Sequence, residues 1–325
     1  MHLVRYIATA LATVFFAGSG FAFAGSPNPT TPPVDEGLVE ELVVTARYPG
    51  PAFWRVSDAD SEIWILAVPS PTPNGLIWDK RQLEKVMKGA NGVVLPSVVT
   101  VGLMDGMKFV ISKRKQFNNP NGKTLAEVLP QSSIDQYLKI DPAFRKANDL
   151  KSKLKPVLFA FQSRMSIYDK KRWSEFYIDN DVVTLARKYK VKIRRASVQP
   201  GLPIAEGIIG LNTAEQIGCF DTIIEGARDS LRNTDDAAKA WADGDTALML
   251  SLTSGASLTA CALNSSQGQS AESKVYADVL NVVKQALAQP GKTLLVVSNA
   301  RGLVEKRGIL AQLRDQGLTV RSPAE

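Results

Sequence analysis

Residues 63–68, with the sequence Ile63-Trp64-Ile65-Leu66-Ala67-Val68, form the stretch that decides the fold. A short, continuous apolar run between polar neighbours is typical of a β-strand that is covered on both faces. Pro69, Pro71 and Pro73 follow directly. Because proline has no backbone N–H, these residues end the pairing of the strand. The stretch therefore predicts one buried strand of a central sheet.

The residues that follow extend this strand into a βαβ-like unit. Residues 82–88 have helical periodicity, and Gly92-Val93-Val94-Leu95 predicts a second short strand that ends at Pro96.

Strands return near the end of the chain. Leu294-Leu295-Val296-Val297 predicts a buried strand, residues 303–316 a helix capped by Gly317, and residues 318–320 an edge strand. The residues between the two ends are mainly helical. Helical periodicity covers residues 125–129, 134–140, 156–165, 182–189, 204–209, 219–231, 237–252 and 275–287, and residues 191–193 are strand-like. We therefore expect an α/β fold, with a central mixed sheet from N- and C-terminal strands and a largely helical middle segment.

The N-terminal residues predict export. Residues 1–24 carry Arg5, an apolar run over residues 6–16 and Ala22-Phe23-Ala24, the pattern of a cleaved signal peptide. The alternative, an uncleaved membrane anchor, requires a longer unbroken apolar stretch. Residues 25–50 are rich in Pro and Thr and predict a linker, which leaves one domain over residues 51–325. We expect a secreted protein of the bacterial periplasm, with no transmembrane helix after signal cleavage.

Composition excludes several kinds of chemistry. The only histidine of the 325 residues is His2, inside the predicted signal peptide. The mature chain would therefore lack His-ligated zinc sites and Ser-His or Cys-His nucleophile systems. The formal net charge is +7, but the basic residues are scattered and match no nucleic-acid-binding motif. We therefore expect no nucleic-acid partner.

The two cysteines, Cys219 and Cys261, leave two alternatives open. An exported chain meets an oxidising compartment, which favours a disulfide between them. The other alternative is a pair of buried free thiols.

Several landmarks, in this order, resemble the TraB/GumN family, the relatives of the Tiki proteases. They are Phe53-Trp54-Arg55-Val56, residues 63–66, Gly75-Leu76-x-Trp78, Ala90-x-x-Val93-Val94-Leu95, Lys155-Pro156, Ala240-Trp241-Ala242-Asp243-Gly244-Asp245, Gly308-Ile309-Leu310-Ala311 and Gly317-Leu318-Thr319-Val320. The resemblance covers residues 50–322. It implies one sheet whose loops after Leu66 and Val297 meet at a cleft.

The resemblance also implies a metal site that this sequence has lost. Active members carry Gly-x-x-His after the first strand, Glu at the end of the second, and Gly-x-x-His after the penultimate strand, groups that implicate a water-activating divalent metal. Here Ala67 and Ser70 occupy the first motif, Pro96 the glutamate position and Gly302 the last histidine position. A looser alignment places Ala196 where many relatives have an acid. We expect no metal and no other cofactor.

Other polar groups remain near these positions. The Ser70 hydroxyl, the Asn299 amide and the Arg301 guanidinium are candidates for binding an anionic or sugar-like ligand. Asp179 and Asp181 stand at a predicted helix start, and we interpret them as N-terminal caps.

Three functional hypotheses follow. The leading one is a non-catalytic family member, a pseudoenzyme that binds a small ligand or an envelope protein. The second is a rewired metal-dependent hydrolase, a peptidase or an esterase. The third is an accessory of TonB-dependent envelope transport, because residues 40–47 resemble the segment that precedes or opens the plug of TonB-dependent receptors.

Overall fold

The computed structural model describes residues 50–323, except residues 147, 254–260, 299–302 and 305–307. The predicted signal peptide, residues 25–49 of the predicted linker, and the candidate residues Asn299, Arg301 and Gly302 lie outside the described residues.

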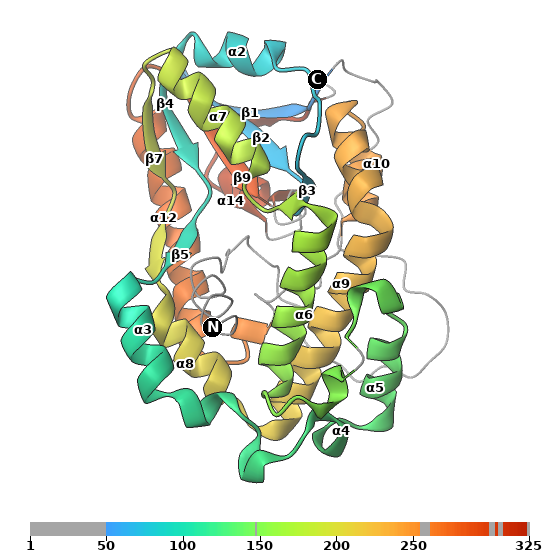
Figure 1. Cartoon of the computed structure of the whole chain (residues 1–325). Coiled ribbons are helices and arrows are strands. Elements are labelled where there is room, and N and C mark those ends of the chain that lie inside the picture. Colours follow the sequence, from blue (N-terminus) through green and yellow to red (C-terminus); the bar gives the residue numbers. More distant parts are fainter. Residues whose placement is uncertain (1–49, 147, 254–260, 299–302, 305–307, 324–325) are drawn as a thin grey trace.

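A six-stranded mixed sheet forms one end of the molecule, in the order β10-β1-β2-β9-β4-β7 (Figure 1). β1 pairs antiparallel with both β10 and β2, whereas β2, β9, β4 and β7 run parallel. The predicted combination of N- and C-terminal strands in one mixed sheet is confirmed. The strands are β1 (Phe53–Ser57), β2 (Ser61–Val68), β4 (Ala90–Leu95), β7 (Lys192–Arg195), β9 (Gly291–Ser298) and β10 (Thr319–Arg321).

The C-terminal strand β9 lies between β2 and β4, so β2 and β4 do not pair with each other. β9 is in register with all of β2, from Ser61 opposite Gly291 to Val68 opposite Ser298. Ile63, Ile65 and Leu66 are almost completely buried. The continuous apolar run is thus explained, because β2 is central and its side chains meet protein on both faces.

Helices cover the sheet and build the other end of the molecule. Figure 1 shows α2 and α7 on the near face of the sheet and α12 and α14 behind it, with α3–α6 and α8 at the far end. The helices are α2 (Arg81–Met87), α3 (Leu103–Ser112), α4 (Leu125–Val128), α5 (Gln131–Leu138), α6 (Pro156–Lys171), α7 (Tyr177–Lys188), α8 (Gly201–Gly210), α9 (Thr213–Ala242), α10 (Thr246–Leu252), α12 (Ser266–Leu287) and α14 (Ile309–Asp315). The predicted helical middle is confirmed.

Two further sheets of two strands each hold the loops that leave the central sheet. β3 (Thr72–Pro73) pairs antiparallel with β6 (Trp173–Ser174), and β5 (Val98–Thr100) pairs parallel with β8 (Val198–Pro200). β3 and β5 follow the first two parallel strands along the chain. The loops that leave the sheet are therefore held by strand pairing.

One helix replaces two predicted ones. α9 runs without a break through residues 232–236, where the polar run Arg-Asn-Thr-Asp-Asp separated the two predicted helices. Thr234 is buried, and Asp235 accepts a hydrogen bond of 3.1 Å from Trp173 Nε1, so tertiary contacts accommodate two of these polar residues inside the helix. The break comes instead at Gly244, whose φ of +80° is the left-handed conformation that favours glycine.

Cys219 and Cys261 are neighbours in the core, and both are buried free thiols. The side chain of Cys219 and burial raise the pKa of the Cys261 thiol. The structure thus brings the two cysteines together, as expected from the sequence, but it does not show the disulfide.

The described helices offer no membrane span. Within residues 50–323, and outside the stated gaps, every helix is too short or too polar to cross a bilayer.

Truncating the central strand should destabilise the whole fold. We expect Ile65→Ala to lower the free energy of unfolding by about 2–5 kcal/mol, because it removes a buried side chain and leaves a cavity. Ile193→Ala, on the edge strand β7 where Ile193 is 37% exposed, is the matched control and should cost less than about 1 kcal/mol. Denaturant unfolding measures both, and equal losses would contradict the central role of β2.

Candidate functional site

The candidate site is the sheet edge where four parallel strands end. Val68 of β2 lies opposite Ser298 of β9, and Leu95 of β4 lies opposite Arg195 of β7. Ligands in open α/β sheets bind beyond such carboxyl ends. The positions that the family resemblance singles out, Ser70 and Pro96, follow β2 and β4 directly and therefore belong to this edge.

The loop after β2 is fixed by hydrogen bonds. The backbone carbonyl of Ala67 accepts a buried bond of 2.7 Å from Trp241 Nε1, and the carbonyl of Pro69 accepts one of 2.7 Å from Thr72 Oγ1. Ser70 between them is half-buried. The family-like tryptophan of α9 thus has a structural role, because it anchors the end of the central strand.

The guanidinium of Arg195, the last residue of β7, lies at the end of the neighbouring strand β4. Arg195 Nη1 donates a hydrogen bond of 3.1 Å to the carbonyl of Pro96, and the same nitrogen lies 3.6 Å from Oδ2 of Asp179 in α7. The side chain of Arg195 is 32% exposed, whereas that of Asp179 is 4% exposed. Arg195 therefore links the glutamate position of the resemblance to a buried carboxylate.

Asp179 is an unusual acid. Within the described part of the chain, neither of its buried carboxylate oxygens has a hydrogen-bond partner. Burial raises the pKa of Asp179 to about 6, and the charge of Arg195 opposes that rise. A carboxyl group with a pKa near neutrality can bind or release a proton under mild conditions.

The interpretation of Asp179 and Asp181 as N-terminal caps is wrong. α7 begins at Tyr177 after Phe176, so both acids lie inside the helix. Asp181 Oδ2 instead accepts a bond of 2.9 Å from Trp78 Nε1 and pairs with Lys80 Nζ at 2.8 Å.

Trp78 and Trp241 then complete this side of the edge. Their ring centroids are 5.0 Å apart. The successive contacts from Asp181 to Trp78, from Trp78 to Trp241 and from Trp241 to the Ala67 carbonyl fix α7 and α9 relative to the end of β2.

These residues do not fit the metal that the resemblance implies. Within the described ranges there is no group of three His, Cys, Asp or Glu side chains that could hold a metal ion. At the glutamate position, the Pro96 carbonyl is engaged by a cation, which is unfavourable for a divalent ion at the same oxygen.

Among the other predicted positions, Ala67 and Ala196 are buried. Asn299, Arg301 and Gly302 follow β9, outside the described residues. The sequence analysis missed Arg195, because it counted this residue among the scattered basic residues, and the contacts with Pro96 and Asp179 depend on the fold.

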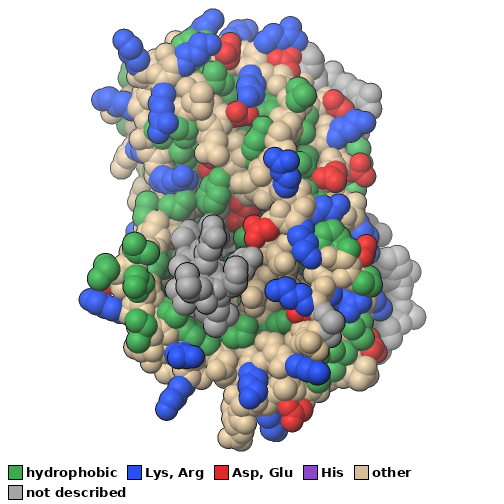
Figure 2. Space-filling model, in the orientation of Figure 1, with side chains coloured by type: hydrophobic (Ala, Val, Ile, Leu, Met, Phe, Trp, Pro, Cys, Tyr) green, Lys and Arg blue, Asp and Glu red, His purple; other side chains and the backbone are tan. Residues whose placement is uncertain are grey.

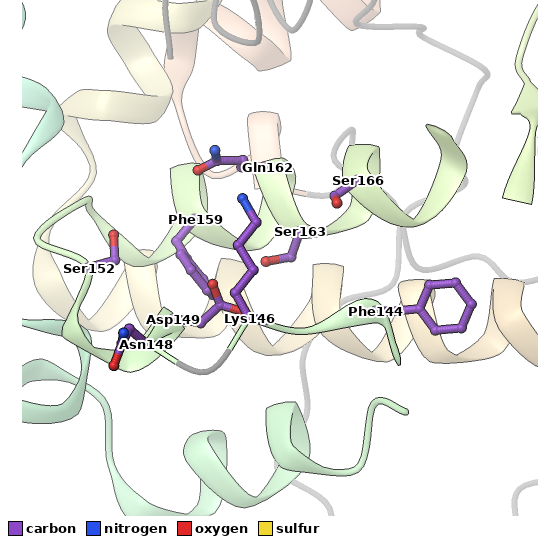
Figure 3. A pocket seen from close by; sticks show the side chains of 9 residues that line it. All are labelled: Phe144, Lys146, Asn148, Asp149, Ser152, Phe159, Gln162, Ser163 and Ser166. Carbon is purple, nitrogen blue, oxygen red and sulfur yellow. The ribbon is translucent and has the colours of Figure 1, made fainter. Parts of the chain in front are cut away.

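A separate polar hollow of about 140 Å³ lies in the helical half (Figure 3). Ser163, Ser166 and Gln162 come from α6, and the rest come from the segment before it, apart from Phe159, also of α6. Its acid, Asp149, accepts hydrogen bonds from Tyr137 Oη and from the backbone N–H of Lys146. Other lining residues are Phe144, Asn148 and Ser152. Because Asp149 is used internally, the hollow offers hydroxyl and amide groups together with the ammonium group of Lys146.

The comparisons with known proteins give one result. The model of the TraB/PrgY/gumN family matches residues 52–322. No curated protein and no solved structure matches the chain.

The raised pKa of Asp179 predicts a pH-dependent stability. Because the folded state binds the proton more tightly than the unfolded state, the free energy of unfolding should fall as pH rises from about 4 to 6 and then level off. Asp179→Asn should remove the contribution of this carboxyl group to the slope and stabilise the protein at neutral pH, by on the order of 2 kcal/mol.

Thermal unfolding across this pH range measures the effect. Asp243→Asn, a change at an exposed residue, is the control and should keep the wild-type slope. A slope that is unchanged in Asp179→Asn would contradict the assignment to this carboxyl group.

Proposed function

This chain belongs to the TraB/PrgY/gumN family, and we propose that it is a non-catalytic member that uses the carboxyl edge of the sheet for binding. The observation that carries the proposal is the hydrogen bond from Arg195 to the Pro96 carbonyl. A cation contacts the position where the resemblance has a metal-binding glutamate.

Charge supports this reading. A guanidinium is always protonated and cannot ligate a metal, and it repels a divalent cation over a few ångströms. Asp179, the acid beside it, is paired with this guanidinium. Ser70 at the first histidine position contributes a hydroxyl group, which is a weak metal ligand and needs an activating base to act as a nucleophile.

The same residues favour a small anionic or sugar-like ligand. Arginine has five N–H donors, and the contacts to Pro96 and Asp179 use Nη1. The part-exposed guanidinium can still bind a carboxylate or phosphate. The Ser70 hydroxyl, in the loop after β2, is a separate candidate contact at this edge. Asn299 and Arg301 are further candidates for this site. The proposal includes export through residues 1–24 and action in the periplasm, where an envelope protein is the other possible partner.

A rewired hydrolase is the second candidate, and Asp179 is the observation that favours it. A buried carboxyl group with a pKa of about 6 has the protonation behaviour of a general acid or base. This candidate predicts turnover of a peptide or ester that Asp179→Asn abolishes. The TonB-related hypothesis depends on residues 40–47, which lie outside the described residues, and it predicts that their deletion weakens association with envelope components.

Metal binding separates the first two candidates. We expect tag-free protein, incubated with Mn²⁺, Co²⁺ and Zn²⁺ and then desalted, to retain far less than one equivalent of metal by mass spectrometry. The variant Ser70→His/Pro96→Glu/Gly302→His/Arg195→Gln restores the ligand types that the resemblance implies and removes the cation, and we expect it to gain a Co²⁺ absorption band. Circular dichroism checks its fold. Tight stoichiometric metal in the wild-type protein would overturn the proposal and favour the hydrolase.

Ligand charge tests the binding role. We expect glucuronate to bind more tightly than glucose in calorimetric titrations, because only glucuronate has a carboxylate for Arg195. Arg195→Gln/Asp179→Asn removes the cation without leaving Asp179 unpaired, and we expect glucuronate affinity to fall about tenfold or more. Asp179→Asn alone keeps the guanidinium and is the matched control. Equal affinity for the two sugars would argue against an anion site at this edge.

A further inference from the structure

Helix α3 (Leu103–Ser112) has two apolar faces. The inner face, with Gly106 and Phe109, is buried. Phe109 packs with Phe117 and with Ala205 and Ile209 of α8 in a small cluster apart from the main core. This cluster attaches the helix to the molecule and leaves its opposite side facing solvent.

The outer face carries four large apolar side chains. Leu103 is 75% exposed, Met104 64%, Met107 47% and Ile111 74%. Residues spaced by three and four positions share one side of a helix, so these side chains form a single stripe. We call it the α3 stripe. Figure 2 shows apolar side chains gathered over α3.

This concentration is not typical of the rest of the surface. Of the nine large apolar residues that are exposed in the described part of the chain, four belong to the α3 stripe, and the others are spread over different elements. Single exposed apolar residues are normal on soluble proteins, whereas a contiguous patch marks an interaction surface.

Exposed cations flank the stripe. Lys108 lies beside it on the helix, and Arg114 and Lys115 follow in the 3₁₀ turn that continues from α3. The acid of this segment, Asp105, is in the first turn of α3, where a negative charge stabilises the helix dipole. The combination of an apolar stripe and a cationic border matches a surface that is apolar inside and anionic outside.

We propose that the α3 stripe docks this protein onto an anionic lipid bilayer. The helix lies in the plane of the interface, with its four apolar side chains at the boundary between headgroups and acyl chains and its cations among anionic headgroups. Methionine is flexible and adapts to such an irregular environment.

A second copy of this chain fits the stripe less well. Closed dimers place the same patch of both subunits in contact, so Lys108, Arg114 and Lys115 would face their own copies. A stable protein interface also uses roughly 20–30 residues on each side, whereas the stripe consists of one short helix. A bilayer has neither requirement.

A local probe tests the proposal in the full chain. Ile111→Cys is labelled with an environment-sensitive fluorophore, and the buried Cys219 and Cys261 are protected from the reagent. We expect its emission to shift to the blue on addition of vesicles of phosphatidylcholine and phosphatidylglycerol, and much less with phosphatidylcholine alone. Label at Leu248→Cys, an exposed apolar position on the different helix α10, is the control and should not respond. No shift at position 111 would overturn the proposal.

Substitutions in the α3 stripe and in the three cations beside it separate the apolar and the electrostatic contributions to vesicle binding. We expect Leu103→Ser/Met104→Ser/Met107→Ser/Ile111→Ser to reduce vesicle cosedimentation more than about tenfold relative to wild type, with an unchanged melting temperature. Leu138→Ser/Leu248→Ser removes exposed apolar groups elsewhere and should bind like wild type.

Each cation near an anionic surface strengthens binding by about fivefold, so Lys108→Gln/Arg114→Gln/Lys115→Gln should lose at least about tenfold. Wild-type binding by the stripe variant would overturn the proposal. So would a blue shift that needs no vesicles and rises with protein concentration, because the stripe would then be covered by a second copy.

Discussion

The parallel pairing of β2 with β9 is the constraint on which the rest of the structure depends. It joins two segments more than two hundred residues apart and places a C-terminal strand between two N-terminal ones. Because β2, β9, β4 and β7 then run in the same direction, the chain leaves all four at one edge. The candidate site therefore owes its position to strand order, and the helical middle supplies the residues that pack around it: Asp179 and Asp181 from α7 and Trp241 from α9.

Electrostatics explain how this edge can persist with a buried acid. An uncompensated carboxylate in the interior is costly, and a partner cation offsets only part of that cost. Arg195 is suited to this position, because one nitrogen contacts both the Pro96 carbonyl and Asp179 while part of the side chain stays in water. The pair holds the ends of β4 and β7 to the start of α7. The positive charge is thus part of the local architecture, and the proposed preference for an anionic ligand depends on it.

The sequence predicted those elements whose pattern has one physical explanation. The apolar runs at residues 63–68 and 294–297 require cover on both faces, and Gly317 marks a helix end because its φ is +81°. Patterns with two explanations were less informative. The polar residues 232–236 indicated a break, but Trp173 and burial accommodate two of them within α9. Asp179 had the spacing of a cap, and its pairing with Arg195 depends on two elements that only the fold brings together. The α3 stripe has helical periodicity too, but periodicity alone does not say which apolar side faces the core.

The insertion of β9 also has a consequence for how the chain is made. Until residues 291–298 have left the ribosome, β2 and β4 cannot acquire the neighbour that both need, and each presents an unpaired, apolar edge. The sheet closes only with a contact of very long sequence separation, which is slow to form. A nascent chain of this protein consequently lacks its complete central sheet until residues 291–298 have been made. The proposed export would benefit from this delay, because it prolongs an incompletely folded state, and the exposed apolar strands of that state are typical targets of chaperones.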